Sequence, residues 1–172
     1  AFSTENWSRP KDEVDYLLFL LESTFNRMID TIEKDNIVIR VIGEKENMSN
    51  KVLELVSRVE EKTKHCTGMI LNVAFNYGSR SEIVNACKKV IASGEEISID
   101  SINKNLYTSD CGDVDLLIRT SGELRISNFL LWQISYSEIY VTDTYWPDFN
   151  STCLDKAIYE FNKRSRRFGG LK

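Results

Sequence analysis

The sequence predicts an α/β fold with a mostly parallel central sheet and helices on both of its faces. The first observation is that short apolar runs alternate with longer segments in which apolar residues recur at helical spacing. The second is that polar residues able to do chemistry follow two of the apolar runs. The third is that no repeat or Gly/Ser-rich linker divides the chain, so residues 1–172 are expected to form a single domain.

The helical segments are marked by spacing and by capping residues. Pro10 suits a first helical turn, and apolar residues from Val14 to Ile32 then follow helical spacing. Ser49 is expected to cap a second helix, and Ser79 with Glu82 to form a capping box before a third. Three further helices are expected at residues 102–106, 129–132 and 154–168.

Four apolar runs are typical of strands buried in a parallel sheet. They are residues 37–42, 69–75, 114–118 and 138–141. Ligands on such sheets lie beyond the carboxyl ends of the strands. The segments 76–80 and 119–123, which follow the second and third runs, are therefore candidates for a binding site.

Composition excludes several classes of function. The net charge of −4 argues against a general nucleic-acid binder. The single histidine, His65, makes a Ser-His-Asp triad improbable and a His-rich metal site impossible, so a surface position is expected for it. The four cysteines form no C-x-x-C pair and are expected to be reduced thiols of a cytoplasmic protein. No apolar run approaches the roughly 18 residues that cross a bilayer, and no P-loop motif is present.

The strongest local signal is the stretch from Arg119 to Ser127. It leaves an apolar strand, passes through a Ser-Gly turn and is expected to enter a helix near Ser127. Two guanidinium groups, a hydroxyl and the N–H groups of a helix start would then surround one point, which suits a diphosphate. Surface ion pairing of Arg119 and Arg125 is the alternative, and the strand-turn-helix setting favours the diphosphate site.

Three other features leave alternatives open. The polar opening from Ser3 to Arg9 forms either a helix-capping loop or part of a site, and capping alone does not explain why Asn6, Trp7 and Arg9 come together. Glu138, which begins an apolar strand, is either a magnesium ligand or the partner of a buried arginine. The apolar run from Tyr16 to Leu21 exceeds one core-facing stripe, so its surplus face either is buried or lines an apolar ligand tunnel.

Four blocks in family order resemble the cis-prenyltransferases, and most closely the bacterial undecaprenyl diphosphate synthases. These blocks are residues 1–10, 72–80, 118–132, and 146–149 with 166–170. The resemblance implies Mg²⁺-dependent condensation of isopentenyl diphosphate onto an allylic diphosphate, usually farnesyl diphosphate, with new cis double bonds and a long polyprenyl diphosphate as product.

The resemblance also implies roles for individual residues. Arg119, Arg125, Ile126 and Ser127 would bind isopentenyl diphosphate, and Glu138 would be a magnesium ligand. Ser3, Thr4, Glu5, Trp7 and Arg9 would line the substrate site, with Arg9 near the allylic diphosphate. Asn6 matches the residue often assigned as proton acceptor. Because a neutral amide is a poor base, Asn6 is expected to orient isopentenyl diphosphate, while the released diphosphate or a water takes the proton.

The family's first motif, Asp-Gly-Asn-Gly-Arg-Trp with its strand and loop, is absent from these residues. The fragment is therefore expected to be inactive, and a non-catalytic subunit of a heteromeric prenyltransferase is the alternative function. The resemblance further implies a homodimer, with the tail at 166–170 near the partner's active site. It also implies a cytoplasmic location with transient contact at the membrane surface, where the lipid product is delivered.

Overall fold

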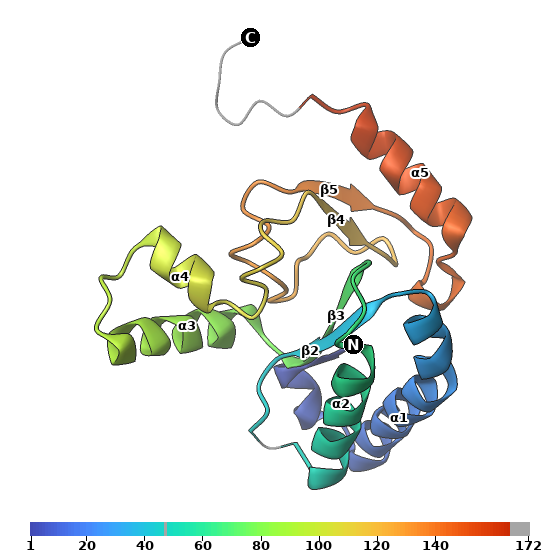
Figure 1. The fold of residues 1–172 in the computed structure, drawn as a ribbon. Coiled ribbons are helices and arrows are strands. Elements are labelled where there is room, and N and C mark those ends of the chain that lie inside the picture. The colour runs from blue at the N-terminus through green and yellow to red at the C-terminus, as the bar shows by residue number, and fades with distance from the viewer. Residues whose placement is uncertain (47, 166–172) are drawn as a thin grey trace. The chain divides into compact units, whose positions relative to one another are not determined.

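The computed structural model describes residues 1–46 and 48–165. The chain divides into two compact units, Ala1–Thr108 and Ser109–Lys172, and each is described by itself (Figure 1).

The first unit is built on a three-stranded parallel sheet. Its strands are β1 (Phe2–Ser3), β3 (Ile70–Tyr77) and β2 (Val38–Ile42), in the order β1-β3-β2. Val38 lies opposite Ile70 in the register, and Phe2 lies opposite Phe75. A short 3-10 helix, η1 (Thr4–Ser8), follows β1 at once, so the polar opening of the chain begins at a strand end.

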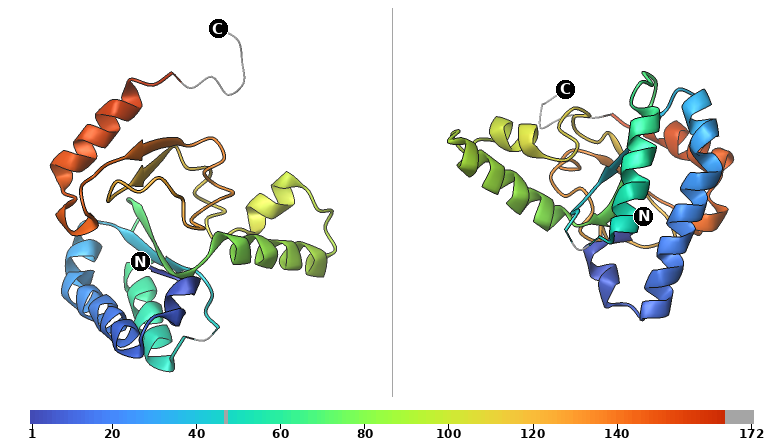
Figure 2. Two further views of the ribbon diagram at one scale, coloured as in Figure 1. Left: turned by 180° about the vertical axis from the view of Figure 1, so that it is seen from behind. Right: turned by 60° about the horizontal axis from the view of Figure 1, so that its bottom comes forward.

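Two helices, α1 (Lys11–Lys34) and α2 (Asn50–Thr63), lie side by side and share one core with this sheet (Figures 1 and 2). Ser49 caps α2 as predicted, because its hydroxyl accepts a hydrogen bond from the Val52 N–H. Phe75 lies at the centre of the core and is 1 % exposed. Members of the core come from both helices and from all three strands: Val14, Phe25, Ile32, Val52, Leu55, Val56, Val59, Phe2, Ile39, Val41 and Phe75.

Helices α3 (Ser79–Ser93) and α4 (Ile99–Asn105) pack against each other as a hairpin. The predicted capping box at Ser79 is wrong. Gly78 is the N-cap, and Ser79 lies buried inside the first turn. Glu82 is also buried, because its carboxylate accepts hydrogen bonds from the Tyr77 hydroxyl and the Tyr107 N–H instead of closing the helix end.

The second unit pairs β4 (Leu116–Arg119) with β5 (Glu138–Val141) in parallel. A short 3-10 helix, η2 (Trp146–Asp148), leads to α5 (Ser151–Asn162), which Asn150 caps by accepting from the Cys153 N–H. The predicted last helix over 154–168 is therefore displaced, and its final residues, from Arg166 on, lie outside the described part of the chain.

The predicted α/β class with parallel strands is confirmed, as is the surface position of His65, whose side chain is 64 % exposed. All four cysteines are free thiols, as expected. The helix predicted at 129–132 is wrong, because these residues form turns. Among the residues that the structure describes, no helix has both the length and the apolar composition to cross a bilayer.

Candidate functional site

Asn6 occupies the turn of η1 that follows the first strand. Its Oδ1 accepts a hydrogen bond of 2.8 Å from the Ser3 N–H, so the oxygen faces the backbone. The amide NH₂ group makes no hydrogen bond within the described residues, and two donors remain for a ligand. Asn6 is therefore arranged to donate hydrogen bonds rather than to accept a proton.

Trp7 is fixed by contacts on both its ring and its nitrogen. Its ring meets Phe2 edge-on at 4.8 Å, and Phe2 in turn stacks on Phe75 at 5.1 Å. Its Nε1 donates a hydrogen bond of 2.7 Å to Asn76 Oδ1. These contacts join η1 to β3 and hold the turn that carries Asn6.

Asn76 begins the segment 76–80, a predicted candidate for a binding site, and it is the polar centre of this region although no individual role was predicted for it. It is 2 % exposed and adopts a left-handed backbone conformation with φ of 49°. Its Nδ2 donates to the carbonyl oxygens of Glu44 at 2.8 Å and Glu46 at 3.3 Å. One side chain thus joins the turn at Trp7 to the loop after β2. The only sequence signal was a polar residue near the end of an apolar run.

The remaining residues of the polar opening lie at the surface. Arg9 forms an ion pair with Glu13 one helical turn later, and about half of its side chain is exposed. The Thr4 hydroxyl donates to Glu5 Oε2 at 3.1 Å. The structure therefore brings Ser3, Asn6 and Trp7 together and leaves Arg9 free to turn toward a ligand at the cost of one exposed ion pair.

In the second unit, Arg119 ends β4 at a turn held by backbone bonds to the residues after β5. Its carbonyl oxygen accepts from the Thr142 N–H at 2.9 Å, and the Ser121 N–H donates to the Thr144 carbonyl oxygen at 2.9 Å. Its side-chain Nε is buried and has no hydrogen-bond partner within the described residues. An unpaired buried donor is costly, so this atom is suited to an anion that the protein would bind.

The helix predicted to start near Ser127 is wrong. Ser127 and Asn128 both have left-handed backbone conformations, with φ of 54° and 58°. Consecutive left-handed residues cannot begin a right-handed helix. The segment runs through isolated turns instead, so the N–H groups of a helix start are not part of this site.

Left-handed residues are concentrated in this segment. Of the six non-glycine residues with positive φ in the described part of the chain, four are Ser121, Ser127, Asn128 and Leu130. Such conformations are costly for residues with a side chain and gather at ligand sites. The backbone strain therefore supports a functional role for 119–130 independently of the arginines.

The other predicted members of this site are less enclosed. Arg125 is mostly exposed and forms an ion pair with Glu123, as the alternative of surface ion pairing predicted for it. Ile126 is half-buried, and its carbonyl oxygen accepts from the Phe129 N–H at 3.3 Å. Ser127 is exposed. Arg119 is thus the more enclosed cation of the segment, and Arg125 is the exposed one.

Glu138 begins β5 and is the partner of an arginine, but this arginine is exposed and not buried as that alternative supposed. Its Oε2 accepts a hydrogen bond of 2.8 Å from Arg164 Nη1, and the same guanidinium donates to the Ile139 carbonyl oxygen at 3.0 Å. The described residues contain no group of three or more His, Cys, Asp or Glu side chains that could enclose a metal ion. A Mg²⁺ site needs fewer protein ligands, since one or two carboxylates with substrate phosphates and water suffice. Glu138 fits that kind of site.

The apolar run in α1 leaves part of its surface uncovered within its own unit. Leu17, Leu18 and Leu21 pack against the core, whereas Tyr16 and Phe19 are about 60 % exposed. A pocket of about 180 Å³ lies between α1 and α2 beside Phe19, and its lining includes Leu18, Phe19, Val52 and Leu55. The helix therefore offers apolar surface beyond what the core uses.

Comparison with known proteins gives one consistent result. The model of the family "Putative undecaprenyl diphosphate synthase" matches residues 1–169. An isoprenyl transferase of Listeria monocytogenes is 48% identical over 99% of this chain and 71% of its own length. An isoprenyl transferase of Fusobacterium nucleatum is 50% identical over 100% of this chain and 75% of its own length.

Two solved structures share the fold. A probable undecaprenyl diphosphate synthase from Campylobacter jejuni superposes with a TM-score of 0.93 and 43% identity, covering 98% of this chain and 80% of that one. Lavandulyl diphosphate synthase from Lavandula x intermedia, solved in complex with dimethylallyl diphosphate, gives a TM-score of 0.92 at 31% identity and covers 98% of this chain and 76% of that one.

Proposed function

The chain belongs to the undecaprenyl diphosphate synthase family of isoprenyl transferases, and from this premise we propose that it condenses isopentenyl diphosphate onto an allylic diphosphate such as farnesyl diphosphate. Each condensation forms one carbon–carbon bond and one cis double bond. The allylic carbon loses its diphosphate, and the isopentenyl unit loses a proton. Repetition of this step gives a long polyprenyl diphosphate.

The observation that carries the proposal is the buried Nε of Arg119 at the end of β4, which has no hydrogen-bond partner among residues 1–46 and 48–165. A diphosphate oxygen would satisfy this donor and would gain a charge-assisted hydrogen bond. Arg125 and the Ser127 hydroxyl, six and eight residues further on, supply further donors once Arg125 leaves its exposed ion pair with Glu123. We assign the diphosphate of isopentenyl diphosphate to this segment.

Asn6 contributes by orientation. Because its oxygen is held by the Ser3 N–H, the amide presents only N–H donors, and these suit a diphosphate oxygen. The proton of the isopentenyl unit is therefore taken by the released diphosphate or by a water. Arg9, Ser3, Thr4, Glu5 and Trp7 complete the proposed allylic side of the site.

A bound Mg²⁺ would neutralise charge on the leaving diphosphate. Glu138 would provide one carboxylate ligand, and substrate phosphates and water would provide the others.

The exposed apolar face of α1 at Tyr16 and Phe19 is the proposed wall for the growing polyprenyl chain. We also propose a homodimer that touches the membrane surface when it releases product. Exposed apolar side chains on and beside the α3–α4 hairpin, at Val84, Ile91, Ile97 and Ile99, support an interface.

The proposal is tested by Arg119→Lys in the full-length enzyme. Lysine keeps the positive charge but lacks the Nε donor and the planar fork of arginine. We expect the KM for isopentenyl diphosphate to rise about 10- to 100-fold, as one or two charge-assisted bonds are lost. The KM for farnesyl diphosphate should change far less.

Arg58→Lys is the matched control, since Arg58 is an exposed residue of α2 that bonds only to Asn26 in the described residues. Arg125→Ala should also weaken isopentenyl diphosphate binding. Unchanged affinity in both Arg119→Lys and Arg125→Ala would contradict the assignment. A full-length protein without transferase activity alone, but with activity beside a second subunit, would support a non-catalytic role instead.

A further inference from the structure

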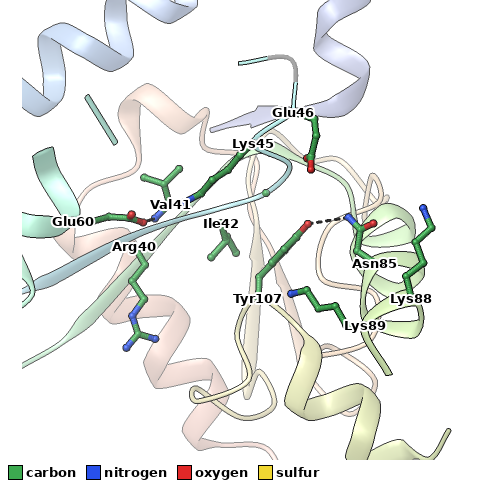
Figure 3. Close-up of a pocket in the computed structure, with 11 residues that line it drawn as sticks. Arg40, Val41, Ile42, Lys45, Glu46, Glu60, Asn85, Lys88, Lys89 and Tyr107 are labelled. Carbon is green, nitrogen blue, oxygen red and sulfur yellow. Dashed lines mark hydrogen bonds between the residues drawn. The ribbon is translucent and has the colours of Figure 1, made fainter. Parts of the chain in front are cut away.

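An open cavity in the first unit involves none of the residues assigned above. It has a volume of about 560 Å³, within the range typical of small-ligand sites, and lies between β2 with its following loop, α2, α3 and Tyr107 (Figure 3). Its lining residues are Arg40, Val41, Ile42, Gly43, Lys45, Glu46, Glu60, Asn85, Lys88, Lys89 and Tyr107.

The lining is positively charged although the chain as a whole is negative. It carries four basic and two acidic side chains, whereas the net charge of the chain is −4. One of the two carboxylates is already engaged, because Glu60 Oε1 accepts from the Val41 N–H at 2.8 Å. Within the described residues, Lys45 and Lys88 form no ion pair, and Lys89 lies over the ring of Tyr107 at 5.7 Å from its centre. A local excess of cations in an acidic protein attracts anions.

Two neutral donors lie on the same wall. The Tyr107 hydroxyl accepts a hydrogen bond of 3.2 Å from Asn85 Nδ2, so its own proton stays available for a ligand (Figure 3). Burial raises the pKa of Tyr107, and the nearby carboxylates of Glu44, Glu82 and Glu46 act in the same direction. The phenol is therefore protonated throughout the physiological range and can donate to an anion.

We propose that this cavity is a second anion site, which binds a small soluble ligand carrying a phosphate or diphosphate group. Lys88 and Lys89 supply the charge, and Tyr107 supplies a hydrogen bond. Ile42 supplies apolar surface for the rest of the ligand. The cavity shares no residue with the proposed diphosphate grip at Arg119, because every lining residue belongs to the first unit.

Asn76, which accepts a hydrogen bond from Trp7, also donates to the loop that forms one wall of the cavity. Gly43, Lys45 and Glu46 line the cavity, and Asn76 donates to the carbonyl oxygens of Glu44 and Glu46 in the same loop. A ligand that orders this loop would act on the bonds of Asn76. Occupancy of the cavity is therefore expected to alter the fluorescence of Trp7.

The test is calorimetric titration with inorganic diphosphate at fixed ionic strength, without magnesium. The full-length protein carries Arg9→Ala, Arg119→Ala and Arg125→Ala, so that the basic residues assigned to both substrate diphosphates are removed. We expect one diphosphate site to remain. Adding Lys88→Gln and Lys89→Gln should weaken it about tenfold or more, since charged hydrogen bonds are lost.

The matched control is Lys51→Gln with Lys64→Gln in the same background. It removes the same charge from exposed positions at the two ends of α2, outside the cavity, and should leave the affinity unchanged. Absence of diphosphate binding in the background protein, or equal weakening in both pairs, would overturn the proposal. Binding to vesicles containing phosphatidic acid without binding to free diphosphate would also overturn it, since the ligand would then be a lipid headgroup. Each outcome is independent of whether Arg119 binds isopentenyl diphosphate.

Discussion

Trp7 Nε1 lies 2.7 Å from Asn76 Oδ1, and this hydrogen bond joins two residues that are 69 positions apart. Asn76 completes the arrangement by donating to the Glu44 and Glu46 carbonyl oxygens. All polar atoms of its side chain are thus used inside the fold. The turn that presents Asn6 is therefore held both by its own hydrogen bond from the Ser3 N–H and by a buried amide from a distant strand.

Asn76→Asp is expected to destabilise the protein. The aspartate keeps an acceptor for Trp7 but places a buried carboxylate against two carbonyl oxygens, which should cost about 2–3 kcal/mol of unfolding free energy. Chemical denaturation measures this change. Asn36→Asp is the control, because Asn36 is also left-handed, with φ of 58°, but is exposed. Equal costs at the two positions would refute the role given to Asn76.

Gly43→Ala should be far more harmful than Gly94→Ala. At Gly43 the φ of 137° is accessible almost only to glycine, and an added Cβ would lie 2.0 Å from the Phe75 carbonyl oxygen. At Gly94 the φ is 75°, and a Cβ would meet nothing within 4 Å. Thermal unfolding should show a loss of about 1–2 kcal/mol for Gly94→Ala from its left-handed backbone, and a clearly larger loss for Gly43→Ala. Similar losses would mean that β2 and β3 approach less closely than described.

Glu82 should tolerate glutamine better than alanine. Glu82→Ala leaves the Tyr107 N–H and the Tyr77 hydroxyl without their acceptor and should cost about 3–5 kcal/mol. Glu82→Gln should cost less, because its oxygen still serves the Tyr107 N–H and the Tyr77 hydroxyl can turn to accept from the new amide. Denaturant unfolding tests this order, and Glu54→Ala at an exposed position of α2 is the control.

Substitutions of Glu138 and Arg164 can distinguish a metal-binding role of Glu138 from a purely structural one. Glu138→Gln and Arg164→Gln break the same ion pair, but only the first removes a carboxylate. If Glu138 is a magnesium ligand, the Mg²⁺ concentration for half-maximal activity should rise about tenfold or more in Glu138→Gln, while Arg164→Gln changes it little. An equal shift in both variants would assign the carboxylate to the ion pair alone.

Tyr107 should make the protein less stable in alkali. Burial raises its pKa in the folded protein above the value of about 10 that it has when unfolded. Below that pH both states are protonated and stability is unaffected. Above it the unfolded state ionises first, so stability falls until the folded pKa is reached. Unfolding measured across this range should fall more steeply for the wild type than for Tyr107→Phe, and parallel curves would contradict the effect.

Some elements could be predicted because their signals are local. The apolar run ending at Ile42 and the cap at Ser49 depend on neighbours within one or two turns, and both are confirmed. The helix predicted at 129–132 failed for the opposite reason. Its apolar pattern suits a helix, but the left-handed residues Ser127, Asn128 and Leu130 break the chain into turns. The φ value of a single residue does not change the spacing of apolar residues, so the pattern could not reveal these turns.

The sequence by itself determined the parallel α/β class, the family, and the segment in which Arg119 and Arg125 stand. Only the tertiary structure decided which polar atoms are already paired. It showed that Asn6 has its oxygen occupied, that Arg119 Nε is buried without a partner within the described residues, and that Glu82 is no helix cap. It also showed the cationic cavity beside Tyr107. The reason is physical, because periodicity and capping act between near neighbours, whereas hydrogen bonds and cavities are formed by residues that folding brings together from distant parts of the chain.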